Sequence, residues 1–204
     1  MKAMRKVIAA VTIVAVAAGM CSCSAPERRH KRDRDRDDEE EEETVEETVE
    51  DLPSGYEKEF GSYEVGYGWV EVDDQSDPPY YFAYCMSGNE DSDEAPNNIA
   101  VSYGSNYYSK EEGADFTSAI LQQITGQAAQ YNGTAAMTEY SEDPDHSYYR
   151  FDMECEDFTV IQWYLTGDYE YVMVSLMISD EDKAEEENAM EVAQQIVDTF
   201  EWET

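Results

Sequence analysis

Residues 169–178 read YEYVMVSLMI, and this stretch decides how the sheet of this protein is built. From Val172 onward every residue except Ser175 is apolar. A strand that is apolar on both faces is buried on both faces, which places it in the interior of a sheet. We therefore predict that 169–178 is a central strand, flanked by other strands on both sides.

The neighbouring segments predict the rest of an antiparallel meander. Residues 149–155 alternate apolar and charged side chains, as expected for a strand with one wet face. A tight turn separates them from a strand at 158–166, and Thr-Gly-Asp at 166–168 is a further turn signal. A weaker strand at 135–140 ends at the turn-forming residues 141–145.

The first half of the domain predicts four more strands, each followed by a turn or loop. They are 62–66, 69–72, 80–86 and 98–103. Ser109 and Glu112 then form a capping box, and Phe116, Ile120, Leu121 and Ile124 share one helix face that ends near Gly126. The last helix opens at Ser179 and Asp182, with Met190, Ala193, Val197 and Phe200 on one side.

The predicted order is ββββ-α-ββββ-α, an α+β fold in which helices flank a mostly antiparallel sheet. We assign residues 56–204 to this single domain, which is long enough to bury a core. Residues 23–55 are predicted to be a charged, disordered linker, because they lack apolar periodicity and contain five consecutive glutamates at 39–43. Its basic block at 28–36 lies beside the N-terminal segment, where anionic headgroups are the nearest partner.

Residues 1–22 are typical of an export signal. Lys2, Arg5 and Lys6 precede a short apolar run at 7–20. The junction resembles a bacterial lipobox, which implies a lipid-carrying cysteine at Cys23, with Cys21 as the alternative. Two acyl chains suffice for stable anchoring. The predicted location is the extracytoplasmic face of the cell membrane, and an ordinary soluble secretory signal is the competing interpretation.

The charge of the chain restricts its partners. The formal net charge is −35, and residues 52–204 contain four Lys or Arg against 34 Asp or Glu. Such a domain repels phosphate backbones, so nucleic acid is excluded as a partner. It attracts cations and basic protein surfaces. The simpler alternative is that the charge serves solubility or adaptation to salt.

Few residues predict chemistry. His30 falls in the linker and His146 in a turn, and the chain has no phosphate-binding Gly-rich loop, so we expect no enzyme and no cofactor. Cys85 and Cys155 either form a disulfide or remain two separate buried thiols. Glu90, Asp91, Asp93 and Glu94 form an acidic loop with oxygen ligands for calcium, or simply a solvated loop.

Tyrosines are the remaining candidates for binding. The chain has 16 of them, and exposed tyrosines suit sugar or protein recognition. The alternative is that they divide between the core and an ordinary surface. The candidates concentrated in the first half are Tyr80, Tyr81, Tyr103, Tyr107 and Tyr108.

Several stretches resemble PsbP and Mog1-like domains. They are FGSYEVGYGWVEV at 60–72, NNIAVSY at 97–103, FTSAILQQI at 116–124 and the ending IVDTFEW at 196–202. Tyr67 stands where that family often has a proline before Gly-Trp. The resemblance covers 60–203 and implies an α/β/α sandwich whose members are binding or assembly factors.

We therefore expect a membrane-anchored binding or assembly module whose partner is a basic protein, a cell-wall glycan or a cation. A glycan-directed hydrolase using two carboxylates is the alternative. A purely structural spacer is a third class.

Overall fold

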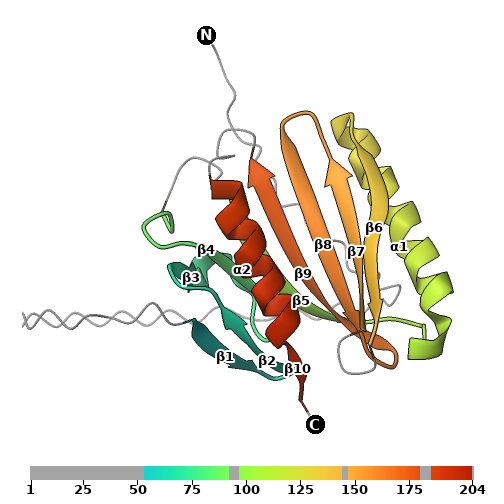
Figure 1. Ribbon diagram of the computed structural model, residues 1–204, viewed down its shortest axis with the longest axis horizontal. Coiled ribbons are helices and arrows are strands. Elements are labelled where there is room, and N and C mark those ends of the chain that lie inside the picture. Colours follow the sequence, from blue (N-terminus) through green and yellow to red (C-terminus); the bar gives the residue numbers. More distant parts are fainter. Residues whose placement is uncertain (1–52, 92–96, 144–146, 180–184, 204) are drawn as a thin grey trace, which may run out of the picture.

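The computed structural model describes residues 53–91, 97–143, 147–179 and 185–203, which form two antiparallel sheets and two α-helices (Figure 1). The predicted signal segment, Cys21, Cys23, nearly all of the linker and His146 lie outside these residues. The larger sheet has seven strands in the order β3 (Trp69–Glu71), β4 (Tyr81–Met86), β5 (Asn98–Ser105), β9 (Glu170–Ser179), β8 (Phe158–Thr166), β7 (Ser147–Glu154) and β6 (Thr134–Glu142).

Strand β9 is the middle strand of this sheet, as its apolar sequence predicted. It pairs antiparallel with β5 on one side and with β8 on the other. Its successive side chains pack alternately in two hydrophobic cores, one on each face of the sheet. Val172 and Val174 belong to one core, and Met173 belongs to the other. All three side chains are fully buried. The sheet therefore needs a covering layer on each face.

Helix α1 (Gly113–Ala128) covers one face, next to β6 and β7 (Figure 1). Phe116, Ile120 and Ile124 are buried there, as their spacing predicted. The predicted capping box is also confirmed: the backbone N–H and the hydroxyl of Ser109 both donate to the Glu112 carboxylate at 2.9 Å. These bonds lower the pKa of Glu112.

Helix α2 (Glu186–Thr199) covers the opposite face together with the smaller sheet (Figure 1). The predicted helix start at Ser179 is wrong, because Ser179 is the last residue of β9. Phe200 follows the helix in extended conformation and is 2% exposed. It belongs to the same buried cluster as the apolar face of α2, although it lies just after the helix and not on it.

The smaller sheet was not predicted. Its order is β1 (Ser54–Lys58), β2 (Gly61–Val65) and β10 (Glu201–Trp202), so five strands precede α1 instead of four, and one more follows α2. Strand β1 begins at Ser54, inside the segment predicted as linker. It forms because Tyr56 packs on the rings of Tyr63 and Tyr84, with centroids 6.1 and 5.2 Å apart.

The architecture is thus α1, the seven-stranded sheet, then α2 with the smaller sheet. This is the predicted α+β sandwich with a second sheet added. None of the helices in the described ranges has the length and apolar composition needed to span a membrane.

Candidate functional site

The predicted tyrosines come together at one end of the large sheet, where β5 ends and β9 begins. Tyr103 is in β5, and its backbone N–H donates to the carbonyl of Tyr80 at 2.9 Å. The rings of these two residues stack with centroids 5.9 Å apart. Tyr80 is 55% exposed, and Tyr107, in the loop after β5, is 67% exposed. Tyr81 is half-buried, and Tyr108 packs edge-on against Phe116 in the core under α1.

Tyr169 joins this end of the sheet, although sequence reasoning placed it in a strand. It lies in the turn between β8 and β9 with φ of 63° and is 58% exposed. Its N–H donates to the Tyr108 carbonyl at 3.0 Å, and its own carbonyl accepts from Asn106 at 2.8 Å. These two bonds tie the turn to the Tyr107 loop. The Gly-Asp turn just before Tyr169 was the signal that this tyrosine is exposed.

The hydroxyl of Tyr103 lies next to a carboxylate, which affects its pKa. Its hydroxyl donates to the Glu170 carboxylate at 2.8 Å. That hydrogen bond, with burial and the charge of Glu170, raises the pKa of Tyr103 to about 12. The Tyr103 ring also stacks on Phe60, with centroids 5.4 Å apart. Tyr103 therefore connects the exposed Tyr80 to the buried aromatic core.

A groove with a volume of about 760 Å³ lies beside these rings. It is lined by Glu57, Lys58, Glu59 and Ser62 of the β1–β2 hairpin, by Pro78, Pro79 and Phe82, and by Glu203. Pro79 directly precedes Tyr80, so the groove borders the tyrosine end. The groove is open to solvent and half polar in its lining, so it suits an extended segment of a partner better than an enclosed small molecule.

The charge of the groove is negative because its own lysine is neutralised. The Lys58 ammonium lies 2.8 Å from the Glu71 carboxylate and 3.7 Å from the centroid of the Phe82 ring. Its side chain is only 12% exposed. Glu57, Glu59 and Glu203 are exposed, and their carboxylates dominate the potential that an incoming ligand meets.

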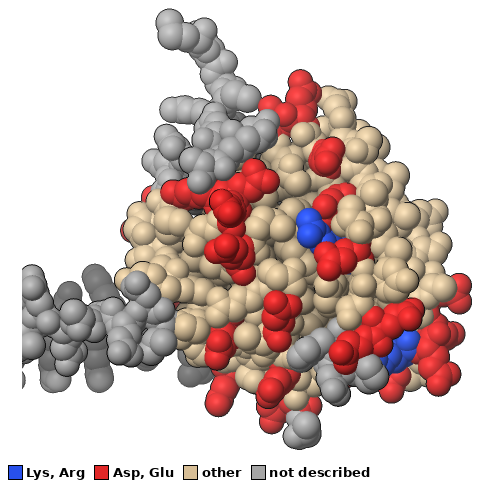
Figure 2. Space-filling view, viewed as in Figure 1, with Lys and Arg blue, Asp and Glu red and all other residues tan. Residues whose placement is uncertain are grey.

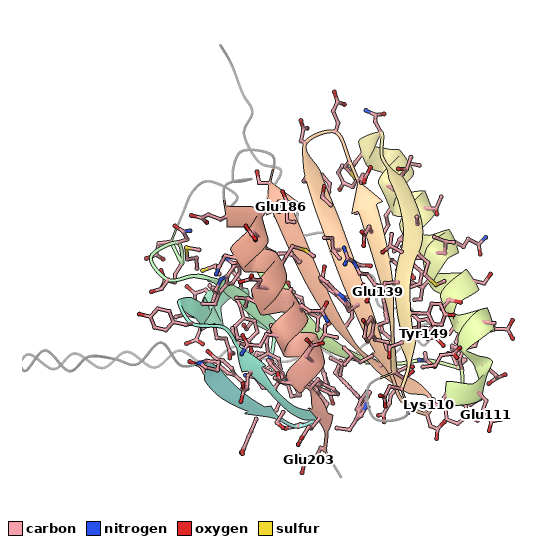
Figure 3. All side chains as sticks on the ribbon, viewed as in Figure 1. Lys110, Glu111, Glu139, Tyr149, Glu186 and Glu203 are labelled. Carbon is pink, nitrogen blue, oxygen red and sulfur yellow. The ribbon has the colours of Figure 1, made fainter. Side chains whose placement is uncertain are left out.

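The surface around the groove is also negatively charged. Figure 2 shows patches of Asp and Glu spread over this face among other residues, with Lys and Arg only at isolated places. Lys58, Lys110 and Arg150 are the basic residues of the described ranges. Arg150 is paired with Asp152 at 2.9 Å and with Glu139 at 3.6 Å. Figure 3 shows Glu203 and Lys110 toward the same end of the molecule, far from Glu186.

The two cysteines of the domain are free in the structure. Cys85 is in β4, and Cys155 follows β7. Strands β5, β9 and β8 lie between β4 and β7. Four strand spacings amount to roughly 19 Å. A disulfide requires Cα atoms within about 7 Å of each other. A Cys85–Cys155 bond therefore does not fit this fold. The alternative prediction, two separate thiols, does fit it. Burial raises the pKa of both.

The calcium candidate lies only partly within the described residues. Asp93 and Glu94 of the calcium candidate lie outside the described residues, and Glu90 accepts a hydrogen bond from the Gly88 N–H at 2.8 Å. Within the described ranges, no group of three or more His, Cys, Asp or Glu side chains could hold a metal ion. These ranges contain no histidine.

No family model matches this chain, and no curated protein does. The solution structure of cyanobacterial PsbP (CyanoP) from Synechocystis sp. PCC 6803 is similar, with a TM-score of 0.52 and 11% identity over 78% of this chain and 98% of that chain. The fold is PsbP-like.

A crystal structure from Bacteroides thetaiotaomicron VPI-5482 has a TM-score of 0.38 and 15% identity over 71% of this chain and 45% of that chain. That score is too low to support any inference. The CyanoP match confirms the PsbP-like fold that the core stretches suggested. At 11% identity, the similarity concerns the fold and not the residues of the groove.

Proposed function

We propose that this protein is a non-enzymatic binding module, anchored on the extracytoplasmic face of the membrane, which binds a basic segment of a partner protein in the groove. The observation that carries this proposal is the groove's charge: three exposed glutamates line it, while Lys58 is neutralised by Glu71. The PsbP-like fold is compatible with a binding role, but a fold alone does not define a partner.

The binding experiment uses the full chain and a labelled peptide that alternates lysine and valine. Fluorescence anisotropy measures its affinity at low and physiological salt. We expect the triple variant E57Q/E59Q/E203Q to bind about tenfold more weakly, since each exposed charge pair contributes roughly 0.2–1 kcal/mol. The matched control is E186Q/E187Q/E191Q, which removes the same charge from exposed positions on α2.

Two results would contradict the proposal. One is equal loss of affinity in both triple variants, because the peptide would then respond only to the net charge. The other is unchanged binding of a peptide whose lysines are acetylated, because acetylation removes the positive charge that the glutamates are proposed to recognise.

The anchor is tested separately in cells. We expect C23A to release the protein from the membrane fraction, because the proposed acyl chains are attached to that thiol. C21A is the matched control and should remain in the membrane fraction. Release of C21A with retention of C23A would place the lipid on Cys21 instead.

A second candidate function is binding of a cell-wall glycan at the tyrosine end. It is favoured by the three tyrosines that are more than half exposed there, Tyr80, Tyr107 and Tyr169. Aromatic rings of this kind suit sugar surfaces. Co-sedimentation with isolated cell-wall glycan tests it: the triple alanine variant should remain in solution while the parent chain sediments. Release of soluble sugar by the parent chain would instead support the carboxylate hydrolase.

A further inference from the structure

Besides its charged side chains, the groove has an edge strand beside it, whose backbone groups are available for hydrogen bonding. Strand β1 lies at the outside of the smaller sheet and pairs with β2; no other strand of the described residues pairs with it. Three consecutive residues of β1 and its turn, Glu57, Lys58 and Glu59, belong to the groove lining, together with Ser62 of β2. The unpaired edge of β1 is therefore next to the groove.

The hairpin register defines which backbone groups face outward. Lys58 pairs with Gly61 across a two-residue turn, and Tyr56 pairs with Tyr63. In such a hairpin the pair that closes the turn exchanges both backbone hydrogen bonds, and bonded pairs alternate along the strands. Gly55 and Glu57 consequently direct their N–H and C=O groups away from β2. Both residues are exposed, so an incoming chain can reach these groups.

From this edge we propose that the basic partner segment binds as an added antiparallel strand along β1. The inference rests on the proposed function, since it assigns a binding mode to the same groove. Backbone hydrogen bonds to Gly55 and Glu57 supply affinity, and alternate side chains supply specificity. A basic residue opposite Glu57 forms an opposite-charge cross-strand pair. The residues between the basic ones then face the proline pair and Phe82.

A second copy of the chain does not suit this edge. In an antiparallel pair of two β1 strands, the registers centred on Glu57 or on Lys58 place glutamates of the two copies directly opposite each other. Like charges in such positions destabilise strand pairing. The edge therefore selects against self-association and favours a strand with alternating positive charge.

The test uses two N-methylated versions of the lysine–valine peptide on the full chain. Residues opposite Glu57 in an antiparallel pair direct their N–H groups toward β1, and these are the lysines. Methylation of the lysine amide nitrogens should weaken binding at least tenfold. Methylation of the valine amide nitrogens, which face solvent, should change affinity by no more than about twofold. Equal effects of the two methylations would overturn the added strand, as would a loss confined to the valine set.

A variant pair tests the same edge from the protein side. E57P removes the outward N–H, which an edge strand tolerates, and E57Q removes only the charge. We expect E57P to bind at least tenfold more weakly than E57Q, with thermal unfolding confirming that both are folded. Equal affinity of these two folded variants would refute the backbone contact.

The possible failures are distinguishable. If the affinity of the unmethylated peptide does not change when the groove glutamates are replaced, the proposed function fails. If it depends on them but the two methylations act equally, only the binding mode fails. If neutralising the basic residues of 28–36 raises peptide affinity at least tenfold, the occupant is this chain's own basic block, and the proposal of a partner protein is overturned.

Discussion

A pair of buried hydroxyls, one on β2 and one on β4, gives a quantitative test of the structure. The hydroxyls of Tyr63 and Tyr84 lie 2.7 Å apart and share a hydrogen bond. Tyr63 is 2% exposed and Tyr84 is fully buried. Burial raises the pKa of both phenols, so both stay protonated at neutral pH. Replacing either tyrosine with phenylalanine leaves the other hydroxyl buried without this partner.

The size of the effect follows from that loss. A buried polar group without its partner costs roughly 1–3 kcal/mol, whereas removing both partners together is nearly neutral. We therefore expect Y63F and Y84F each to lose roughly 1–3 kcal/mol of unfolding free energy. The double variant should lose less than the sum of the two single losses. For a domain of this size, each kcal/mol lowers Tm by about 2–4 °C.

The assay is urea unfolding of all four proteins at pH 7, followed by tryptophan fluorescence. Equal m values would show that the unfolded states are comparable. Repeating the series at pH 9 should give the same differences, because both phenols stay protonated in the folded state. If the double variant loses as much as the two single variants together, the hydroxyls are not coupled and the argument is refuted.

Three further predictions test other features. G61A should lose about 1–3 kcal/mol in urea unfolding, because an added Cβ would collide with the Glu201 backbone carbonyl; an unchanged value would argue against the β2–β10 pairing. The folded-state pKa of Tyr103, about 12 against an ordinary 10.0, stabilises the fold below pH 10, and this contribution is lost as pH rises toward 12. Stability measured between these pH values should fall more steeply in the parent chain than in Y103F, and parallel curves would contradict this. Thiol labelling in denaturant without reductant, with peptide mapping, should modify both Cys85 and Cys155; protection of both would indicate a disulfide.

The sequence predicted those parts of the fold that local pattern encodes. The continuous apolar run of β9 identified the central strand, because burial on both faces requires apolar residues at every position. The capping box at Ser109 located the entry to α1, because its hydrogen bonds join residues three positions apart. Both features depend on near neighbours in the chain.

The smaller sheet could not be predicted in this way. Strand β1 carries little apolar surface and follows an acidic stretch, so its sequence resembles the linker before it. It is stable because β2 pairs with it and because the ring of Tyr56 packs against the rings of Tyr63 and Tyr84. Strand β10 has only two residues and depends in the same way on β2. Contacts between distant segments decide both strands.

The sequence by itself determined the acidic character of the domain, the alternation of its strands and the α+β class, because composition and periodicity are local properties. The tertiary structure alone decided which charges and rings meet. The groove combines residues from the first hairpin, the proline pair and the C-terminus, and the turn carrying Tyr169 closes onto the Tyr107 loop. The physical reason is that the distances between these residues depend on how the chain folds. Their separation in the sequence does not determine those distances.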